Sequence, residues 1–335
     1  MNPAKGLPCL KRGGFLYREW RPPPMVRILV VNASRCPVWT GFCWFFRTPK
    51  GFSLARSTTD LSACGEIVRQ NDPDRFFSTL FAPAARREAL FALYAFNNEL
   101  ARVAETVSEP MLGEIRLQWW REALNGIEQG TPRRHDVVEA LATAWDNGVR
   151  RDLLDAMIEA RNVDLAPEPP ETIDDLAAYG RQTAGCMMEQ AVALIGQERE
   201  DNGDLFDDAG VAVALCGLLR STASFAAQGR VMLPRETLES RRLKVRDILR
   251  GETNNRISEA IKSVALRAEE HLKRARKGAR CLPKAAVPAL LPLSFAAHDL
   301  VTLRKNGYNP YHGAVQRPGG ERQIVALWRA FIGRV

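Results

Sequence analysis

The chain has 335 residues, of which 46% are apolar and 26% are charged, a composition that is ordinary for a soluble globular protein. Its formal net charge of +8 is concentrated at one end, because residues 1–59 contain ten Lys or Arg and only one acid, Glu19. The remainder is close to neutral, so the charge does not indicate a nucleic-acid-binding protein.

Residues 1–60 are predicted to be a basic, disordered leader outside the folded domain. This stretch sustains no helical or strand period, and it is rich in Arg and poor in acids, as mitochondrial transit peptides are. It also contains more Trp and Pro than such peptides usually do, so a start codon assigned too early is an equally good explanation. A hypothesis of nucleic-acid or membrane-surface binding would depend on this leader alone.

Membrane spans and disulfides are not expected. No apolar run reaches the length of about eighteen residues that a bilayer-crossing helix needs. Outside the leader the cysteines are widely spaced and form no CxxC or Cys/His pattern of a metal site: Cys64, Cys186, Cys216 and Cys281. The sequence therefore predicts a soluble or membrane-peripheral protein in a reducing compartment.

From Cys64 onward, the spacing of apolar residues predicts helices and no strands. The helix after Ser108-Glu109-Pro110 begins with a typical start signal and ends near Gly130. Ala285–Leu303 is nearly all apolar, and we expect it to be one fully buried helix. The other predicted helices are Arg86–Glu105, Asp136–Trp145, Arg151–Leu165, Ile173–Gly196, Leu205–Gln228, Arg256–Gly278 and Arg322–Ile332.

The end of one apolar helix carries the strongest functional signal. Residues 215–234 read LCGLLRSTASFAAQGRVMLP, where Gly229 favours the end of the helix and Pro234 prevents its resumption. The segment resembles the second motif of the squalene/phytoene synthase family, in which Asn-Ile-Leu-Arg-Asp and a Glu-Asp pair lead into Gly-Arg-x-x-Leu-Pro. In that family two aspartates one turn apart hold Mg²⁺ against a diphosphate. Here their positions are occupied by Ser221 and Phe225.

The first metal motif of that family is also altered. Tyr94-Ala95-Phe96 resembles the segment before it, and in this register its three acids fall on Ala101, Arg102 and Glu105. One remaining carboxylate cannot gather the divalent ions that prenyl diphosphate cleavage needs. The resemblance therefore implies a catalytically degenerate site without metal or cofactor. Four side chains remain as candidates for contact with an anion or another pocket ligand: Arg102, Arg220, Arg230 and Tyr179.

The resemblance covers nearly all of residues 70–300 in order and spacing. Tyr179 precedes Thr183-Ala184-Gly185, which resembles the small-residue helix beside the substrate in the synthases, and Met157–Leu165 resembles a segment that leaves Asp164 as a retained acid. It implies an all-α fold, namely a single-domain helical bundle of the isoprenoid-synthase type around a central cavity, over residues 64–335. An alternative role for Arg102 is to pair with Glu99 or Glu105 at helical spacing.

Within the family, Ala95–Leu124 and Leu219-Arg220-Ser221-Thr222 resemble the divergent branch represented by mitochondrial complex I assembly factor 6 and its alphaproteobacterial relatives. This implies an assembly factor for respiratory complex I (NADH:ubiquinone oxidoreductase), with complex I subunits or assembly intermediates as partners and an isoprenoid or lipid in the cavity. It implies a peripheral position at the bacterial inner membrane, or in the mitochondrial matrix or inner membrane. Trp119 and Trp120 could belong to a partner surface, although Trp120 lies on the apolar stripe and fits the core better.

The alternative function is an active prenyl diphosphate transferase of the squalene/phytoene synthase type. Its Mg²⁺ ligands would have to come from acids such as Glu99, Glu105 and Asp164, and these would have to converge across one cavity. The sequence offers no other route to catalysis, because it has no Gly-rich phosphate loop and no nucleophile beside a histidine.

Overall fold

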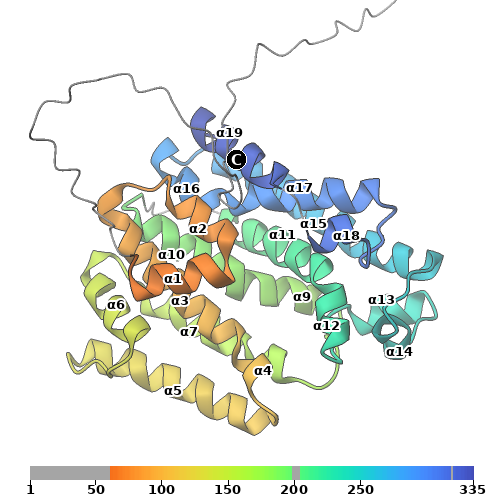
Figure 1. The fold of residues 1–335 in the computed structure, drawn as a ribbon, viewed down its shortest axis with the longest axis horizontal. Coiled ribbons are helices and arrows are strands. Elements are labelled where there is room, and N and C mark those ends of the chain that lie inside the picture. The colour runs from red at the N-terminus through yellow and green to blue at the C-terminus, as the bar shows by residue number, and fades with distance from the viewer. Residues whose placement is uncertain (1–60, 198–203, 318–319) are drawn as a thin grey trace, which may run out of the picture. The chain divides into compact units, whose positions relative to one another are not determined.

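The computed structural model describes residues 61–197, 204–317 and 320–335, and within these ranges the chain is helical, without a strand (Figure 1). The all-α prediction is therefore confirmed. The described residues belong to one unit, Thr58–Val335. The predicted leader, residues 1–60, lies outside the described residues, so its nature stays a prediction.

The helices follow one another with short connections. In chain order they are α1 (Ala63–Asn71), α2 (Pro73–Thr79), α3 (Arg87–Ala101), α4 (Val103–Thr106), α5 (Pro110–Glu128), α6 (Asp136–Ala144), α7 (Arg151–Ala160), α8 (Asn162–Leu165), α9 (Ile173–Gly180), a π-helical turn (Arg181–Gly185), α10 (Cys186–Leu194), α11 (Leu205–Arg220), α12 (Thr222–Ala227), α13 (Arg235–Ser240), α14 (Val245–Leu249), α15 (Asn255–Ala279), α16 (Val287–Leu290), α17 (Pro292–Lys305), α18 (Gly313–Gln316) and α19 (Glu321–Ile332).

Helix α11 is the centre of the bundle, and α9, α10, α15 and α17 pack around it (Figure 1). Its close approach to α9 depends on glycine. A Cβ atom on Gly210 would lie 2.5 Å from the carbonyl oxygen of Gly180 and 2.5 Å from the backbone nitrogen of Gly185, which no side chain can tolerate. The backbone of α11 can therefore touch the end of α9 and the π-helical turn that follows it.

The prediction of one buried helix over Ala285–Leu303 is wrong in its continuity. The segment divides into α16 and α17, which meet at an angle of 50°. Pro292 lacks the N–H that would continue the ladder of hydrogen bonds, so the helix bends there. Most of the segment is buried as expected, but Val301 is exposed. Among the described residues no single helix has the length and hydropathy to cross a membrane, and this bent pair meets those criteria only when it is joined.

For the two tryptophans of α5, the sequence allowed a place either in the core or on a partner surface. Trp120 is buried and meets Phe96 edge to face with 5.2 Å between ring centroids, so it fills the core. Trp119 is half-buried, and the guanidinium of Arg133 lies over its ring. The start of α5 differs slightly from the prediction, because the residue before the helix is Glu109 and its side chain makes no capping hydrogen bond.

Candidate functional site

A cavity of about 630 Å³ lies among α3, α9, α11 and α17, and it collects positions from both altered motifs. Ala101 from the first motif lines it, as do Ser221 and Phe225 from the second. The other two positions of the first motif lie elsewhere, because Arg102 and Glu105 are exposed and neither is part of the cavity lining.

Helices break where they pass this cavity. The regular helix ends at Arg102 (φ −85°, ψ −7°), one residue after Ala101, and again at Ser221 (φ −85°, ψ 2°), and in each case a short new helix follows. A third break falls at Arg161, and the turn Arg181–Gly185 is π-helical. Such irregularities are frequent at functional sites. The predicted helices Arg86–Glu105, Arg151–Leu165, Ile173–Gly196 and Leu205–Gln228 are thus interrupted, and the interruptions lie at or beside the cavity lining.

Arg161 organises a polar cluster at one side of the cavity. It is 7% exposed, and it donates hydrogen bonds to Oδ1 of Asn97 at 2.9 Å, to the hydroxyl of Tyr179 at 2.8 Å and to Oδ2 of Asp164 at 3.1 Å. The hydroxyl of Tyr179 also donates to Asp164 at 3.1 Å. Burial raises the pKa of Tyr179, so this phenol stays neutral. We call these residues, together with Arg230, the Asp164 cluster.

Arg230 joins this cluster by way of Phe225. Its guanidinium lies over the Phe225 ring, 5.5 Å from the centroid. From there it donates a hydrogen bond to the carbonyl oxygen of Asp164 at 2.8 Å and approaches the carboxylate to 3.5 Å. The phenyl group at a predicted metal-ligand position therefore supports a cation. With two arginines around one aspartate, the cluster carries a formal charge of +1.

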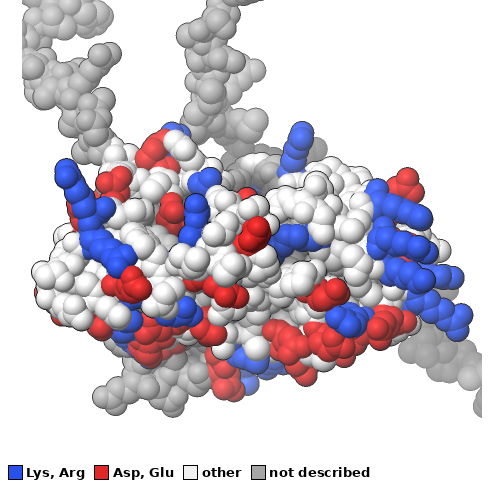
Figure 2. Space-filling view, turned by 90° about the horizontal axis from the view of Figure 1, so that it is seen from below, with Lys and Arg blue, Asp and Glu red and all other residues white. Residues whose placement is uncertain are grey.

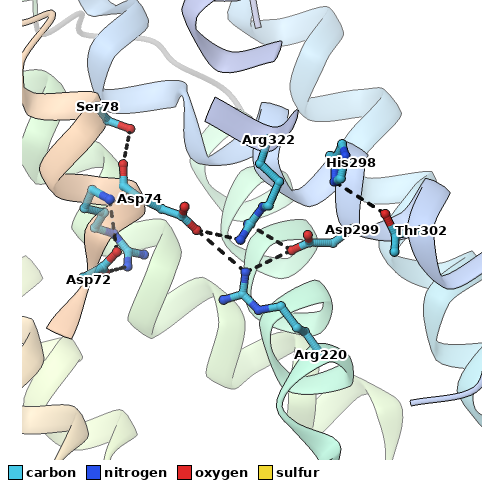
Figure 3. A network of polar contacts seen from close by, with 9 residues as sticks. Asp72, Asp74, Ser78, Arg220, His298, Asp299, Thr302 and Arg322 are labelled. Carbon is cyan, nitrogen blue, oxygen red and sulfur yellow. Dashed lines mark hydrogen bonds and ion pairs between the residues drawn. The ribbon is translucent and has the colours of Figure 1, made fainter. Parts of the chain in front are cut away.

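A second cluster closes another part of the cavity wall, and Figure 3 shows two arginines lying between two aspartates. Arg322 of α19 reaches Asp74 of α2 at 3.0 Å and Asp299 of α17 at 3.1 Å. Arg220 of α11 reaches the same two acids at 3.7 Å and 3.2 Å. Charges balance in this group, which we call the Asp299 cluster. Burial raises the pKa of the Asp299 carboxyl, while Arg220 and Arg322 act in the opposite direction.

The remaining reactive side chain at the cavity is Cys216. Burial raises the pKa of its thiol, so the group is protonated at neutral pH and is a poor nucleophile.

The three acids required by the alternative function do not converge. Asp164 is held by Arg161, Tyr179 and Arg230, as described above. Glu105 is exposed. Glu99 lies on the side of α3 that faces Cys64, where burial and then the charges of Asp136, Glu88 and Glu99 raise the pKa of the thiol to about 11. Within the described residues, no group of three or more His, Cys, Asp or Glu side chains is placed to hold a metal ion.

The candidate pocket residues fall into different places. Tyr179 and Arg220 line the cavity, and Arg230 lies behind Phe225. Arg102 is exposed and takes part in none of the ion pairs formed among the described residues, so its predicted pairing with Glu99 or Glu105 is not observed.

Sequence reasoning missed several residues that shape the cavity: Asp74, Asn97, Arg161, Asp299 and Arg322. One of them had a visible signal. Asp299 is the single acid in the nearly apolar stretch Ala285–Leu303, and a charge among apolar helical residues requires a partner. Its partners come from α11 and α19, which no local pattern indicates.

The sequence matches the family model of squalene/phytoene synthases over residues 68–327. It is 27% identical over 268 residues to the NADH dehydrogenase (ubiquinone) complex I assembly factor 6 of Bos taurus, with 80% of each chain covered. It is 23% identical over 293 residues to the 15-cis-phytoene synthase of Synechococcus elongatus, covering 83% of this chain and 92% of the relative. A crystal structure of a dehydrosqualene synthase with a ligand superposes with a TM-score of 0.69 at 18% identity, over 80% of this chain and 94% of that one. The predicted resemblance to the family and to its assembly-factor branch is confirmed.

Proposed function

Because the chain belongs to the squalene/phytoene synthase family, we propose that it uses the family fold without prenyl transfer, as an assembly factor for respiratory complex I. The observation that carries this proposal is the replacement of a metal-binding acid by an aromatic ring that supports an arginine at the cavity. Phe225 stands where the resemblance places a metal-binding aspartate, and its ring supports the guanidinium of Arg230. A site that positions a fixed cation there repels a dication instead of gathering it.

The acids that do lie near the cavity support the same conclusion. Asp74, Asp164 and Asp299 each contact two arginines, at distances between 3.0 and 3.7 Å. To serve as metal ligands they would have to leave these partners, and separating a buried ion pair costs about 3–5 kcal/mol. Cleavage of an allylic diphosphate needs divalent ions held by several carboxylates at once. We therefore propose neither a metal nor a cofactor, and Mg²⁺ enters only under the alternative function.

The relatives support the assembly role. Four mammalian proteins named as complex I assembly factor 6 match this chain at 25–27% identity over at least 76% of its length. Complex I subunits or assembly intermediates are the proposed partners. The proposed location is the mitochondrial matrix or inner membrane, or the cytoplasmic side of the inner membrane in a bacterium.

The cavity itself is proposed to hold an isoprenoid or another lipid with an anionic head. Its volume lies within the range of roughly 300–1,000 Å³ that is usual for small-molecule sites. The Asp164 cluster offers a net positive charge for the head, and Ala184, Met187 and Val213 offer apolar surface for a chain.

The test uses Glu105, the last carboxylate of the two motifs. In cells that lack the endogenous protein, Glu105→Gln should restore assembled complex I on native gels as well as the unchanged chain does, since an assembly factor does not use this exposed side chain. Arg161→Met, which disrupts the cavity wall, serves as the comparison. Loss of complementation by Glu105→Gln alone would contradict the proposal.

A second experiment addresses catalysis and partners directly. The purified chain, incubated with farnesyl or geranylgeranyl diphosphate and Mg²⁺, should release no pyrophosphate, and mild crosslinking in membranes should capture complex I subunits. Clear turnover, abolished by Glu105→Gln, would instead establish the prenyl transferase.

A further inference from the structure

The outer face of α19 is apolar and open. Ile324, Leu327, Trp328 and Phe331 follow one another at helical spacing, and their exposed fractions are 67%, 50%, 63% and 83%. The rings of Trp328 and Phe331 stack with 6.2 Å between centroids. Exposed large apolar side chains are common one at a time, but four on one stripe of a short helix form a continuous surface.

The opposite face of the same helix is firmly docked. Ala326 is fully buried in a small apolar cluster with Phe295 and Leu291, and Arg322 is 4% exposed between Asp74 and Asp299. Helix α19 lies along the bundle beside α17 (Figure 1). The apolar outer stripe is therefore held in a fixed orientation by the structure beneath it and does not belong to a loose tail.

Cations lie beside the C-terminal half of this stripe. Residues 271–298, which span the end of α15 and the start of α17, contain six Lys or Arg and no acid. The side chain of Lys284 packs closely against Gly333 at the end of α19. A Cβ atom added to Gly333 would lie only 2.8 Å from the Cδ atom of Lys284. Arg276 lies near Arg329. Burial, and in second place the like charge of Arg329, lower the pKa of Arg276. Arg334 is exposed one turn beyond Phe331.

We propose that the outer face of α19 and its cationic rim bind the anionic surface of a lipid bilayer, with α19 lying in the plane of the interface. Apolar residues on one side of an amphipathic helix enter the boundary between head groups and acyl chains, while adjacent cations attract anionic lipids. Trp and Phe suit this position because their rings fit the boundary. The inference does not depend on the proposed function, since either an assembly factor or an enzyme could use such a surface.

Charge argues against two other occupants. The leader, residues 1–59, is itself strongly basic and would be repelled by the rim, and a second copy would present the same cations. The exposed apolar residues at the start of α5 offer a useful contrast. Met111 and Ile115 are 61% and 60% exposed, but the acids Glu109 and Glu114 lie beside them and no comparable cationic run does.

The experiment measures sedimentation of the full chain with vesicles of phosphatidylcholine alone and of phosphatidylcholine mixed with phosphatidylglycerol. The unchanged chain should bind the anionic vesicles and bind them less well as salt is added. Trp328→Ser with Phe331→Ser should lower binding at least about tenfold, because two rings no longer enter the interface. The matched control, Met111→Ser with Ile115→Ser, should bind as the unchanged chain does.

A second pair of variants tests the rim. Lys284→Glu with Arg329→Glu should also lower binding at least about tenfold, since each cation near the surface contributes about fivefold. Figure 2 shows another gathering of Lys and Arg at the end of the molecule where α13 and α14 lie, which supplies the control. Reversing two exposed cations there, in Arg246→Glu with Arg250→Glu, should change binding little, because no aromatic stripe adjoins them.

Fluorescence identifies the contact within the full chain. Brominated phosphatidylglycerol should quench part of the tryptophan emission, and Trp328→Phe should remove most of the quenched part while sedimentation persists. Several results would overturn the proposal: equal binding to neutral vesicles, unchanged binding by the α19 variants, quenching that survives Trp328→Phe, or a dimer that the Ser variants convert to monomers.

Discussion

The two polar clusters at the cavity differ in charge and in what they connect. The Asp164 cluster holds one acid against two arginines, and its members come from α3, the junction of α7 and α8, α9 and the segment after α12. The Asp299 cluster balances two acids against two arginines, and it joins α2, α11 and α17 to the C-terminal helix. The Asp164 cluster therefore has positive charge available for a ligand. In the Asp299 cluster the charges are balanced, and its main effect is to hold α19 in place.

The comparison shows that the ratio of arginines to aspartates decides what such a cluster can do. An excess of arginine leaves positive charge for a ligand, whereas equal numbers hold helices together. A buried ion pair is weak evidence for stability when it is compared with an apolar replacement, but removing one partner is costly because a charge is left alone. The following predictions use that asymmetry to separate the two clusters.

Arg322→Met should have the largest effect, lowering the free energy of unfolding by about 4 kcal/mol, because the buried carboxylate of Asp299 and the half-buried carboxylate of Asp74 are left to share Arg220. Denaturant titration measures it. Arg329→Met, on the same helix but outside the cluster, should cost about 0.5 kcal/mol or less. Equal effects of the two substitutions would show that the cluster does not hold α19.

Arg161→Met should lower the free energy of unfolding by about 3 kcal/mol, somewhat less than Arg322→Met, because Asp164 keeps Arg230 and Tyr179 as partners while Asn97 loses its donor. The same titration applies. A loss well below about 1 kcal/mol would mean that water replaces Arg161 at the cavity and that the cluster is already solvated.

Asp164→Asn should raise the affinity for inorganic pyrophosphate about fivefold, since it removes the one negative charge beside Arg161 and Arg230. Calorimetric titration measures this affinity. The comparison is Asp299→Asn, which should raise it less, because Arg220 and Arg322 retain Asp74. A larger gain from Asp299→Asn would place the anion site in the other cluster.

The smallest expected effect concerns pH. Burial raises the pKa of Asp299 in the folded protein, so on acidification this carboxyl takes up its proton at a higher pH than it does in the unfolded chain. Its ionisation therefore costs stability above the folded pKa, and this cost disappears as the pH falls toward the unfolded value. Relative to Asp299→Asn, the unchanged chain should gain stability across the acidic range, as thermal melts at several pH values would show.

Much of the fold could be predicted from the sequence, since the order of helices follows from apolar spacing and from the two motifs. Of the five positions that the motif register names, Ala101, Ser221 and Phe225 line one cavity in the structure, whereas Arg102 and Glu105 do not. The breaks at Arg102, Arg161 and Ser221 could not be predicted. They depend on packing around the cavity, and local propensity at these residues favours no particular end.

The contacts between distant segments were likewise beyond the sequence. Asp74, Asp299 and Arg322 come from three parts of the chain, and although Asp299 stands out as an acid in an apolar stretch, nothing local indicates which residues are its partners. Only the tertiary structure brings them within ion-pair distance. The exposure of α19 could not be predicted either, because the spacing of apolar residues along an amphipathic helix is the same whether its apolar side faces a core or solvent.

Helix α19 supplies the fourth member of an otherwise incomplete charge set. If the tail beginning at Glu321 detached, Asp74 and Asp299 would remain opposite each other with Arg220 alone between them, and this wall would change from neutral to negative. The protein thus carries an internal counter-ion on its last helix, and the position of that helix decides whether this part of the cavity wall is neutral or has a net charge of −1.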